Sequence, residues 1–157
     1  MKMLCKFFAV VLIASFFAYG QEPAGKVSKF DDAEYLHLTG ADKKTATPIR
    51  GTLGFNNETK IVEFVDKKNV PAFSIKYDAI KSILYERTST PRYVAALLVS
   101  PFFLFSHSKK HYLTIQYTDD AGTGQFVSIH LDKKNARDVV ATAEAATGKK
   151  VEREEEK

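Results

Sequence analysis

The chain has 157 residues, 23 of them basic and 19 acidic, and its net charge of +4 is too small to indicate nucleic acid as a partner. Its single cysteine, Cys5, lies in a segment typical of an export signal, which excludes disulfides, thiolate metal sites and a cysteine nucleophile from the exported chain. The length fits one domain that its hydrophobic core must stabilise without cross-links.

Residues 1–20 predict a signal peptide. Lys2 and Lys6 give a basic start, residues 7–17 form an apolar run, and residues 18–20 form a small-x-small cleavage site. Without this segment, 21 basic residues stand against 19 acidic ones, a net charge of +2. We therefore expect an exported protein, periplasmic or secreted.

After the signal we expect a flexible lead (21–29), one domain (30–151) and a charged, solvated tail (152–157). In the first part of the domain, apolar and polar residues alternate as they do in half-buried strands. These expected strands are 34–38, 50–56, 59–65, 73–77 and 82–87. The segments between them predict a loop at 39–48, turns at 56–58 and 66–69, and a single helical turn at 78–80.

Two further alternating segments, 113–117 and 127–131, flank a polar stretch at 119–124 whose residues tolerate left-handed turn conformations. They predict a hairpin. A helix follows, which Asp132 can cap and Gly148 is placed to end. Its apolar positions form a narrow stripe of small residues, which suits a helix lying closely across a sheet or the mouth of a barrel. They are Ala136, Val139, Val140, Ala143 and Thr147.

Seven short strands followed by one helix is the element order of the pleckstrin-homology superfold. The passage FSIKYDAIKSILY at 73–85 resembles the strand, turn and strand of its bacterial branch, and residues 132–151, which include ATGKKV, resemble the helix and exit of exported proteins of this type. The chain is thus similar to bacterial pleckstrin-homology-like (PH/GRAM-like) domain proteins over residues 30–151. The resemblance implies a mainly β fold with one C-terminal α-helix: a bent antiparallel barrel of about seven strands capped by the helix.

Members of this superfold bind phosphoinositide headgroups, peptides or protein partners, and the fold alone does not choose among them. Lipid-binding members carry a dense basic cluster in the loop between the first two strands. Here that loop holds only the pair Lys43-Lys44, so the chain departs from those members at this point.

The residues from Tyr93 to Phe105 form an uncharged run of thirteen within an expected insertion, residues 92–108. As a helix this run would rise about 20 Å, too little to span about 30 Å of bilayer hydrocarbon. Pro101 would break such a helix. Three interpretations are open: packing on the domain's own sheet, insertion into a membrane surface, or contact with a protein partner.

The last two interpretations make this segment a binding site, in which flanking cations would meet anionic headgroups. The candidate residues are Arg92, Tyr93, Leu97, Leu98, Phe102, Phe103, Phe105, Lys109 and Lys110. We hypothesise an exported, non-enzymatic domain that is membrane-associated or partner-bound through this segment. The alternative is a carrier of a small hydrophobic ligand, with residues 93–105 as a lid over a pocket.

The sequence predicts no catalytic residue, no cofactor and no metal site. It contains no Gly-x-Ser-x-Gly, no glycine-rich phosphate loop and no His-Glu-x-x-His. His107 and His111 have helical ligand spacing, but Lys109 and Lys110 lie between them and His111 enters a strand. Five Lys-Lys pairs are interpreted as solvated charge, with a weak anionic surface site as the alternative. Five tyrosines are interpreted as packing side chains, with a ligand cavity as the alternative: Tyr35, Tyr77, Tyr85, Tyr112 and Tyr117.

Overall fold

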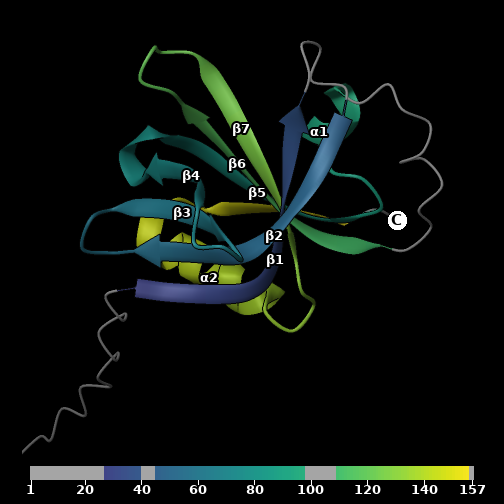
Figure 1. Ribbon diagram of the computed structural model, residues 1–157, viewed down its shortest axis with the longest axis horizontal. Helices are drawn as coiled ribbons and strands as arrows, with labels where there is room; N and C mark the ends of the chain where they lie inside the picture. Colours follow the sequence, from purple (N-terminus) through teal and green to yellow (C-terminus); the bar gives the residue numbers. More distant parts are fainter. Residues whose placement is uncertain (1–26, 40–44, 98–108, 156–157) are drawn as a thin grey trace, which may run out of the picture.

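The structure, a computed structural model, describes residues 27–39, 45–97 and 109–155 (Figure 1). The strands in these residues are β1 (Val27–Thr39), β2 (Thr45–Asn56), β3 (Ile61–Asp66), β4 (Pro71–Lys76), β5 (Ile80–Thr88), β6 (Lys110–Thr118), β7 (Gly124–Leu131) and β8 (Val151–Glu155). The helical elements are the 3-10 turn η1 (Tyr77–Ala79), α1 (Arg92–Leu97) and α2 (Ala136–Thr147). All the described strands belong to one sheet in the order β4-β3-β2-β1-β7-β6-β5-β8, so the fold is mainly β with α2 as its C-terminal helix, as predicted.

The long strand β1 joins the two halves of this sheet. It pairs with β2 along its length, whereas its described pairing with β7 is limited to Glu34 with His130 and Tyr35 with Ile129. A register shift precedes this junction, at Asp32, whose φ is 58°. Such a bulge bends a strand and increases its twist, so the sheet changes direction where its halves meet.

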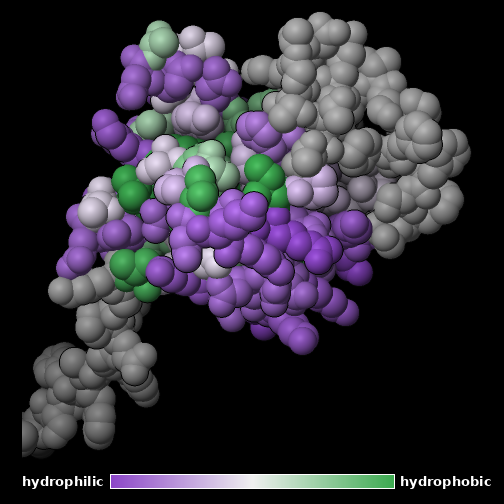
Figure 2. Space-filling model, viewed as in Figure 1, coloured by the Kyte–Doolittle hydropathy of each residue, from purple (hydrophilic) through white to green (hydrophobic). Residues whose placement is uncertain are grey.

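The main core lies between the inner face of the bent sheet and α2. Every described strand contributes to it, and its largest fully buried side chains are Phe55, Phe64, Leu53, Ile80, Ile83, Leu113, Ile115, Ile129, Leu131, Val62 and Val139. The buried positions of α2 are the predicted ones, Ala136, Val139, Val140 and Ala143. The helix ends at Gly148, whose φ is 66° and whose N–H donates to the Glu144 carbonyl at 3.0 Å. The described surface that Figure 2 shows is mostly hydrophilic, with a few scattered hydrophobic residues.

A second, smaller buried region lies on the opposite face of β5, β6 and β7. Side chains alternate between the faces of a strand, and Leu84 and Tyr112 are buried outside the main core cluster. Val94 of α1, which is 0% exposed, belongs to this region, and α1 contacts β7. The polar members are satisfied, since the Thr114 hydroxyl donates to Ser128 Oγ at 3.2 Å. Helix α1 therefore covers the outer face of the second half of the sheet.

The predicted strands, the hairpin formed by 113–117 and 127–131, the helical turn and the C-terminal helix are confirmed, with differences at element ends. β1 begins at Val27, inside the expected lead, and β2 begins at Thr45, inside the expected loop. The helix α2 begins at Ala136, preceded by a turn in which the Asp132 carboxylate accepts from the Lys134 N–H at 2.8 Å. Asp132 thus shapes the approach to the helix and does not occupy its N-cap position.

The predicted charged tail (152–157) is exposed at Glu152, Arg153 and Glu154, as expected, but its described part forms a strand. Residues 151–155 form β8, which pairs in parallel with β5, an eighth strand where about seven antiparallel ones were expected. Val151 is 2% exposed, and Arg153 Nη2 lies 3.4 Å from Glu144 Oε2. Charged residues dominate this segment, so one buried valine gives too weak a sequence signal for a strand.

Candidate functional site

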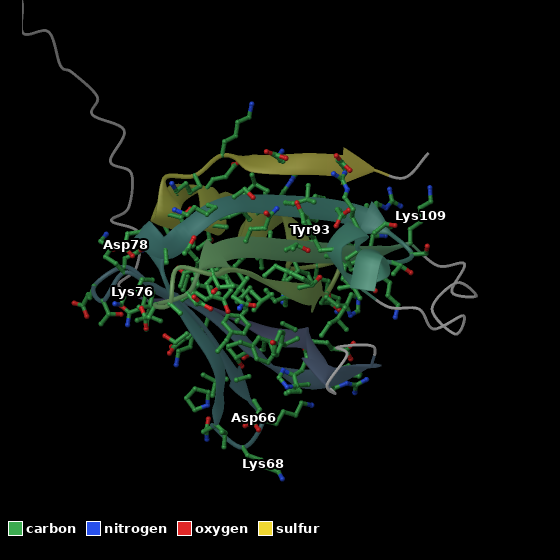
Figure 3. The ribbon with its side chains drawn as sticks, turned by 90° about the horizontal axis from the view of Figure 1, so that it is seen from above. Asp66, Lys68, Lys76, Asp78, Tyr93 and Lys109 are labelled. Atoms are coloured by element: carbon green, nitrogen blue, oxygen red, sulfur yellow. The ribbon has the colours of Figure 1, made fainter. Side chains whose placement is uncertain are left out.

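The predicted insertion connects β5 to β6 at one end of the sheet. The two strands are antiparallel neighbours, and Thr88 near the end of β5 pairs with Lys110 at the start of β6. The chain therefore leaves and rejoins the sheet at the same end, which we call the rim. Figure 3 shows Tyr93 and Lys109 toward this end of the molecule, away from Lys76.

A buried carboxylate holds the start of α1 at the rim. Glu86 is 5% exposed, and each of its oxygens accepts a hydrogen bond from the Arg92 N–H at 3.3 Å. Arg92 Nε lies 3.9 Å from Glu86 Oε1, and the guanidinium also pairs with Glu154 of β8. Burial raises the pKa of Glu86, and the hydrogen bond and charge of Arg92 oppose that rise. Arg92 therefore ties α1 to β5 and β8.

The next two residues of the apolar run pack on the sheet. The rings of Tyr93 and Phe126 lie 5.6 Å apart at 41°, and the Tyr93 hydroxyl is hydrogen bonded to the Gln116 side-chain amide. Val94 is fully buried. For Tyr93 and Val94, packing on the domain's own sheet is what the structure describes, and these contacts fix where the run begins.

The other candidate residues are described only in part. Leu97 lies in the last position of α1, Lys109 is exposed, and Lys110 is half-buried at the start of β6. The remaining four, Leu98, Phe102, Phe103 and Phe105, lie outside the described residues, as do the predicted signal and most of the predicted lead. None of the helices among the described residues has the length and apolar character to cross a membrane.

A polar cluster that sequence reasoning missed lies at the junction of β1 and β7. Glu34 accepts from Arg50 Nε at 2.8 Å and lies 3.2 Å from His130 Nδ1, and the ring of Tyr112 lies 5.4 Å from that of His130. Burial alone would raise the pKa of Glu34, but hydrogen bonds and charges of His130 and Arg50 together outweigh it and lower this pKa. Burial and then the charge of Glu34 raise the pKa of Tyr112 to about 12.

The lowered pKa of Glu34 makes stability depend on pH. A carboxylate with a depressed pKa in the folded protein stabilises the fold above its unfolded-state value, about 4.3, and this contribution is lost as pH falls through the folded value. We expect Glu34→Gln to lower the free energy of unfolding by about 1 kcal/mol near pH 7 and by much less near pH 3. Urea unfolding at both pH values measures this difference.

The matched control is Glu152→Gln, because Glu152 is exposed on β8. It should change the unfolding free energy little at either pH. If Glu34→Gln and Glu152→Gln behave alike near neutral pH, the junction cluster does not contribute to stability as described.

Two other polar residues that the sequence singles out, His111 and Asp119, form hydrogen bonds within the fold. His111 lies in β6, where its Nδ1 is 2.5 Å from the Tyr85 hydroxyl, and no group of three or more potential metal ligands occurs among the described residues. Asp119 is at a hairpin tip, as predicted, and its carboxylate accepts from the Thr123 N–H at 2.8 Å and from Gln125 Nε2 at 3.1 Å. These hydrogen bonds lower the pKa of Asp119.

The bent sheet with a C-terminal helix packed on it has the pleckstrin-homology-like fold. A solved structure to which the chain is similar is described as "Structure of the Spt16D Pob3N heterodimer"; the TM-score is 0.52 and the sequences are 8% identical. The similarity covers 83% of this chain and 56% of that one, so the chain spans little more than half of the solved chain. No family model and no curated protein matches the sequence. At this identity the similarity supports the fold alone.

Proposed function

We propose that the chain is an exported, non-enzymatic binding domain that contacts an anionic membrane surface through the rim segment, residues 92–110. The signal predicted at 1–20 and the uncharged run from Tyr93 to Phe105 support this from the sequence. The fold is compatible with it, because the superfold hosts headgroup and protein binding without fixing either.

The observation that carries the proposal is that both ends of the segment containing the apolar run are held to the sheet. Its start is held by the buried carboxylate of Glu86 and by the buried side chain of Val94, and its return is fixed by the pairing of Thr88 with Lys110. Residues 98–108, between these anchors, contain no Asp, Glu, Lys or Arg and include Phe102. Each large apolar side chain transferred from water yields about 1.5 kcal/mol or more, so a few of them suffice for reversible attachment.

A carrier with residues 93–105 as a lid is the second candidate, and the described residues favour it less. The rings of Tyr35, Phe64 and Phe73 fill the inner space near β4, with centroids 5.1 to 5.9 Å apart. The cavity beside Tyr35 and Phe73 measures about 190 Å³. Small-molecule sites usually begin at about 300 Å³, so this aromatic-lined cavity is too small for a typical hydrophobic ligand. Two larger cavities, of about 340 and 450 Å³, are lined largely by charged and polar side chains, which suit a hydrophobic ligand poorly.

Vesicle flotation of the chain from Gln21 onward tests the membrane proposal. We expect recovery with vesicles that contain an anionic lipid and weaker recovery with neutral ones, because Lys109 and Lys110 flank the run. The triple variant Phe102→Ser, Phe103→Ser, Phe105→Ser should bind at least about tenfold more weakly, since each replacement removes apolar surface.

The matched control is Val70→Ser, which removes an apolar side chain that is 56% exposed in the turn between β3 and β4. This turn lies on a projecting hairpin, near the labels for Asp66 and Lys68 in Figure 3. Val70→Ser should float like the unchanged protein. If the triple variant also floats unchanged, the run does not bind the membrane. If even the unchanged protein fails to float, the membrane proposal is wrong and the protein-partner interpretation of the same segment replaces it.

Fractionation of the source cells tests export separately. We expect the protein in the exported compartment, with a share that leaves the membrane fraction only with detergent. Recovery in the cytoplasm would contradict the signal prediction, whatever the vesicle result.

A further inference from the structure

A cavity of about 340 Å³ lies between α2 and the inner face of β5, β6 and β8. Its lining residues come from four elements and one turn, and all belong to the described part of the chain: Tyr85, His111, Lys133, Ala136, Arg137, Val140 and Arg153. None of them belongs to the rim segment. The cavity is therefore a separate feature of the fold.

Three basic side chains converge on this cavity. Lys133 comes from the turn before α2, Arg137 from the first turn of α2, and Arg153 from β8. Arg153 bonds Glu144 through Nη2 at 3.4 Å, whereas no carboxylate of the described residues lies within ion-pair distance of Lys133 or Arg137. Like charges brought together repel, and one carboxylate offsets that repulsion only in part. The cavity is thus suited to a further anion.

An aromatic pair forms another part of the wall. The Tyr85 hydroxyl lies 2.5 Å from His111 Nδ1, and the two rings are stacked with centroids 6.0 Å apart at 26°. β-Sheet register explains the arrangement, because Arg153 of β8 is paired directly with Tyr85 of β5. Ala136 and Val140 add aliphatic surface. The cavity therefore offers apolar contacts beside its cations.

We propose that this cavity binds a small phosphate ester, with Lys133, Arg137 and Arg153 around the phosphate and the organic part against Tyr85. Guanidinium and ammonium groups form charge-assisted hydrogen bonds with phosphate oxygens. A phosphate monoester carries a charge of about −1.5 to −2 near pH 7. This charge balances the two cations without a carboxylate partner, Lys133 and Arg137, better than the single negative charge of a carboxylate ligand would. Ligand sites span about 300 to 1,000 Å³, so the volume fits a phosphate that carries one ring or a short chain.

Nuclear magnetic resonance titration with phenyl phosphate, and with inorganic phosphate for comparison, tests the proposal at constant ionic strength. We expect saturable shifts of the Tyr85, His111 and Val140 amides, with phenyl phosphate bound more tightly than inorganic phosphate. The double variant Lys133→Gln, Arg137→Gln should weaken phenyl phosphate binding by about tenfold or more, because it removes two charge-assisted contacts.

The control is the double variant Lys134→Gln, Lys150→Gln, which makes the same change in net charge at exposed positions outside the cavity lining. Its affinity should stay within about twofold of the unchanged protein, because neither side chain lines the cavity and exposed charges are screened by salt. Equal weakening in the two double variants would show a general charge effect and overturn the proposal. Shifts that spread over the surface without reaching Tyr85 or Val140 would overturn it as well.

Phosphate esters occur both as soluble molecules and as lipid headgroups, and vesicles containing phosphatidic acid separate these sources. If Lys133→Gln, Arg137→Gln loses vesicle binding while the triple phenylalanine variant keeps it, the headgroup is the ligand. If the double variant Lys133→Gln, Arg137→Gln loses phenyl phosphate affinity but keeps vesicle binding, the ligand is a soluble ester. The cavity and the rim segment share no residue, so either proposal can fail while the other stands.

Discussion

Replacement of Gly51 by alanine is expected to destabilise the fold by about 3 kcal/mol or more. Gly51 lies in β2 where the backbone of β3 approaches closely: a Cβ there would sit 2.0 Å from the Val65 carbonyl oxygen and 2.8 Å from Phe64 Cε1. Neither neighbour can move aside cheaply, because one is backbone and Phe64 is 0% exposed. Urea unfolding should show a much lower midpoint, or no cooperative transition at all.

Gly54→Ala in the same strand is the matched control. A Cβ at Gly54 would lie 3.3 Å from Glu63 Cγ, part of a flexible side chain that can shift. We expect a cost below about 1 kcal/mol. If Gly51→Ala unfolds at the same urea concentration as Gly54→Ala, the close approach of β2 and β3 is not a constraint on the fold.

The second large effect is expected for Val151→Asp. Val151 is 2% exposed, belongs to the main core and pairs with Ile83 of β5, while its N–H donates to Glu144 Oε1 at 3.1 Å. A carboxylate at this position would be buried without a partner, so we expect a loss of about 3 kcal/mol or more. The free energy of unfolding measures it.

Two companion variants separate burial from general disturbance of β8. Val151→Ala should cost about 1 to 3 kcal/mol because it only removes methyl groups from the core. Glu152→Ala, at the exposed neighbouring position, should be nearly neutral. A neutral Val151→Asp would mean that the C-terminal residues are a solvated tail after all, as their charge suggests.

Local patterns predicted most of the fold. Alternating residues such as Leu113, Ile115 and Tyr117 mark a strand whatever its partner, and Gly148 marks a helix end because it can adopt a positive φ. Strand ends were less predictable. Val27 and Thr45 extend β1 and β2 because each strand offers the other a long partner, and that pairing is a tertiary property.

The candidate site was predictable only as a stretch of chain. Thirteen uncharged residues stand out in any sequence, and the structure places the start of the run at the rim, where β5 ends and β6 begins. The carboxylate under α1 was not foreseen, because Glu86 in a strand resembles any solvent-facing acid until Arg92 lies against it. Glu34 and His130 are far apart in the sequence and meet only through the pairing of β1 with β7.

The narrow junction between β1 and β7 also bears on how the molecule opens. In the described residues only Glu34 with His130 and Tyr35 with Ile129 join the two halves of the sheet, while each half keeps a long ladder of its own. Sub-global opening follows the least costly boundary in a structure. For this domain we expect that boundary to be the junction of β1 with β7, so that hydrogen exchange by sub-global opening would separate the two halves of the sheet there.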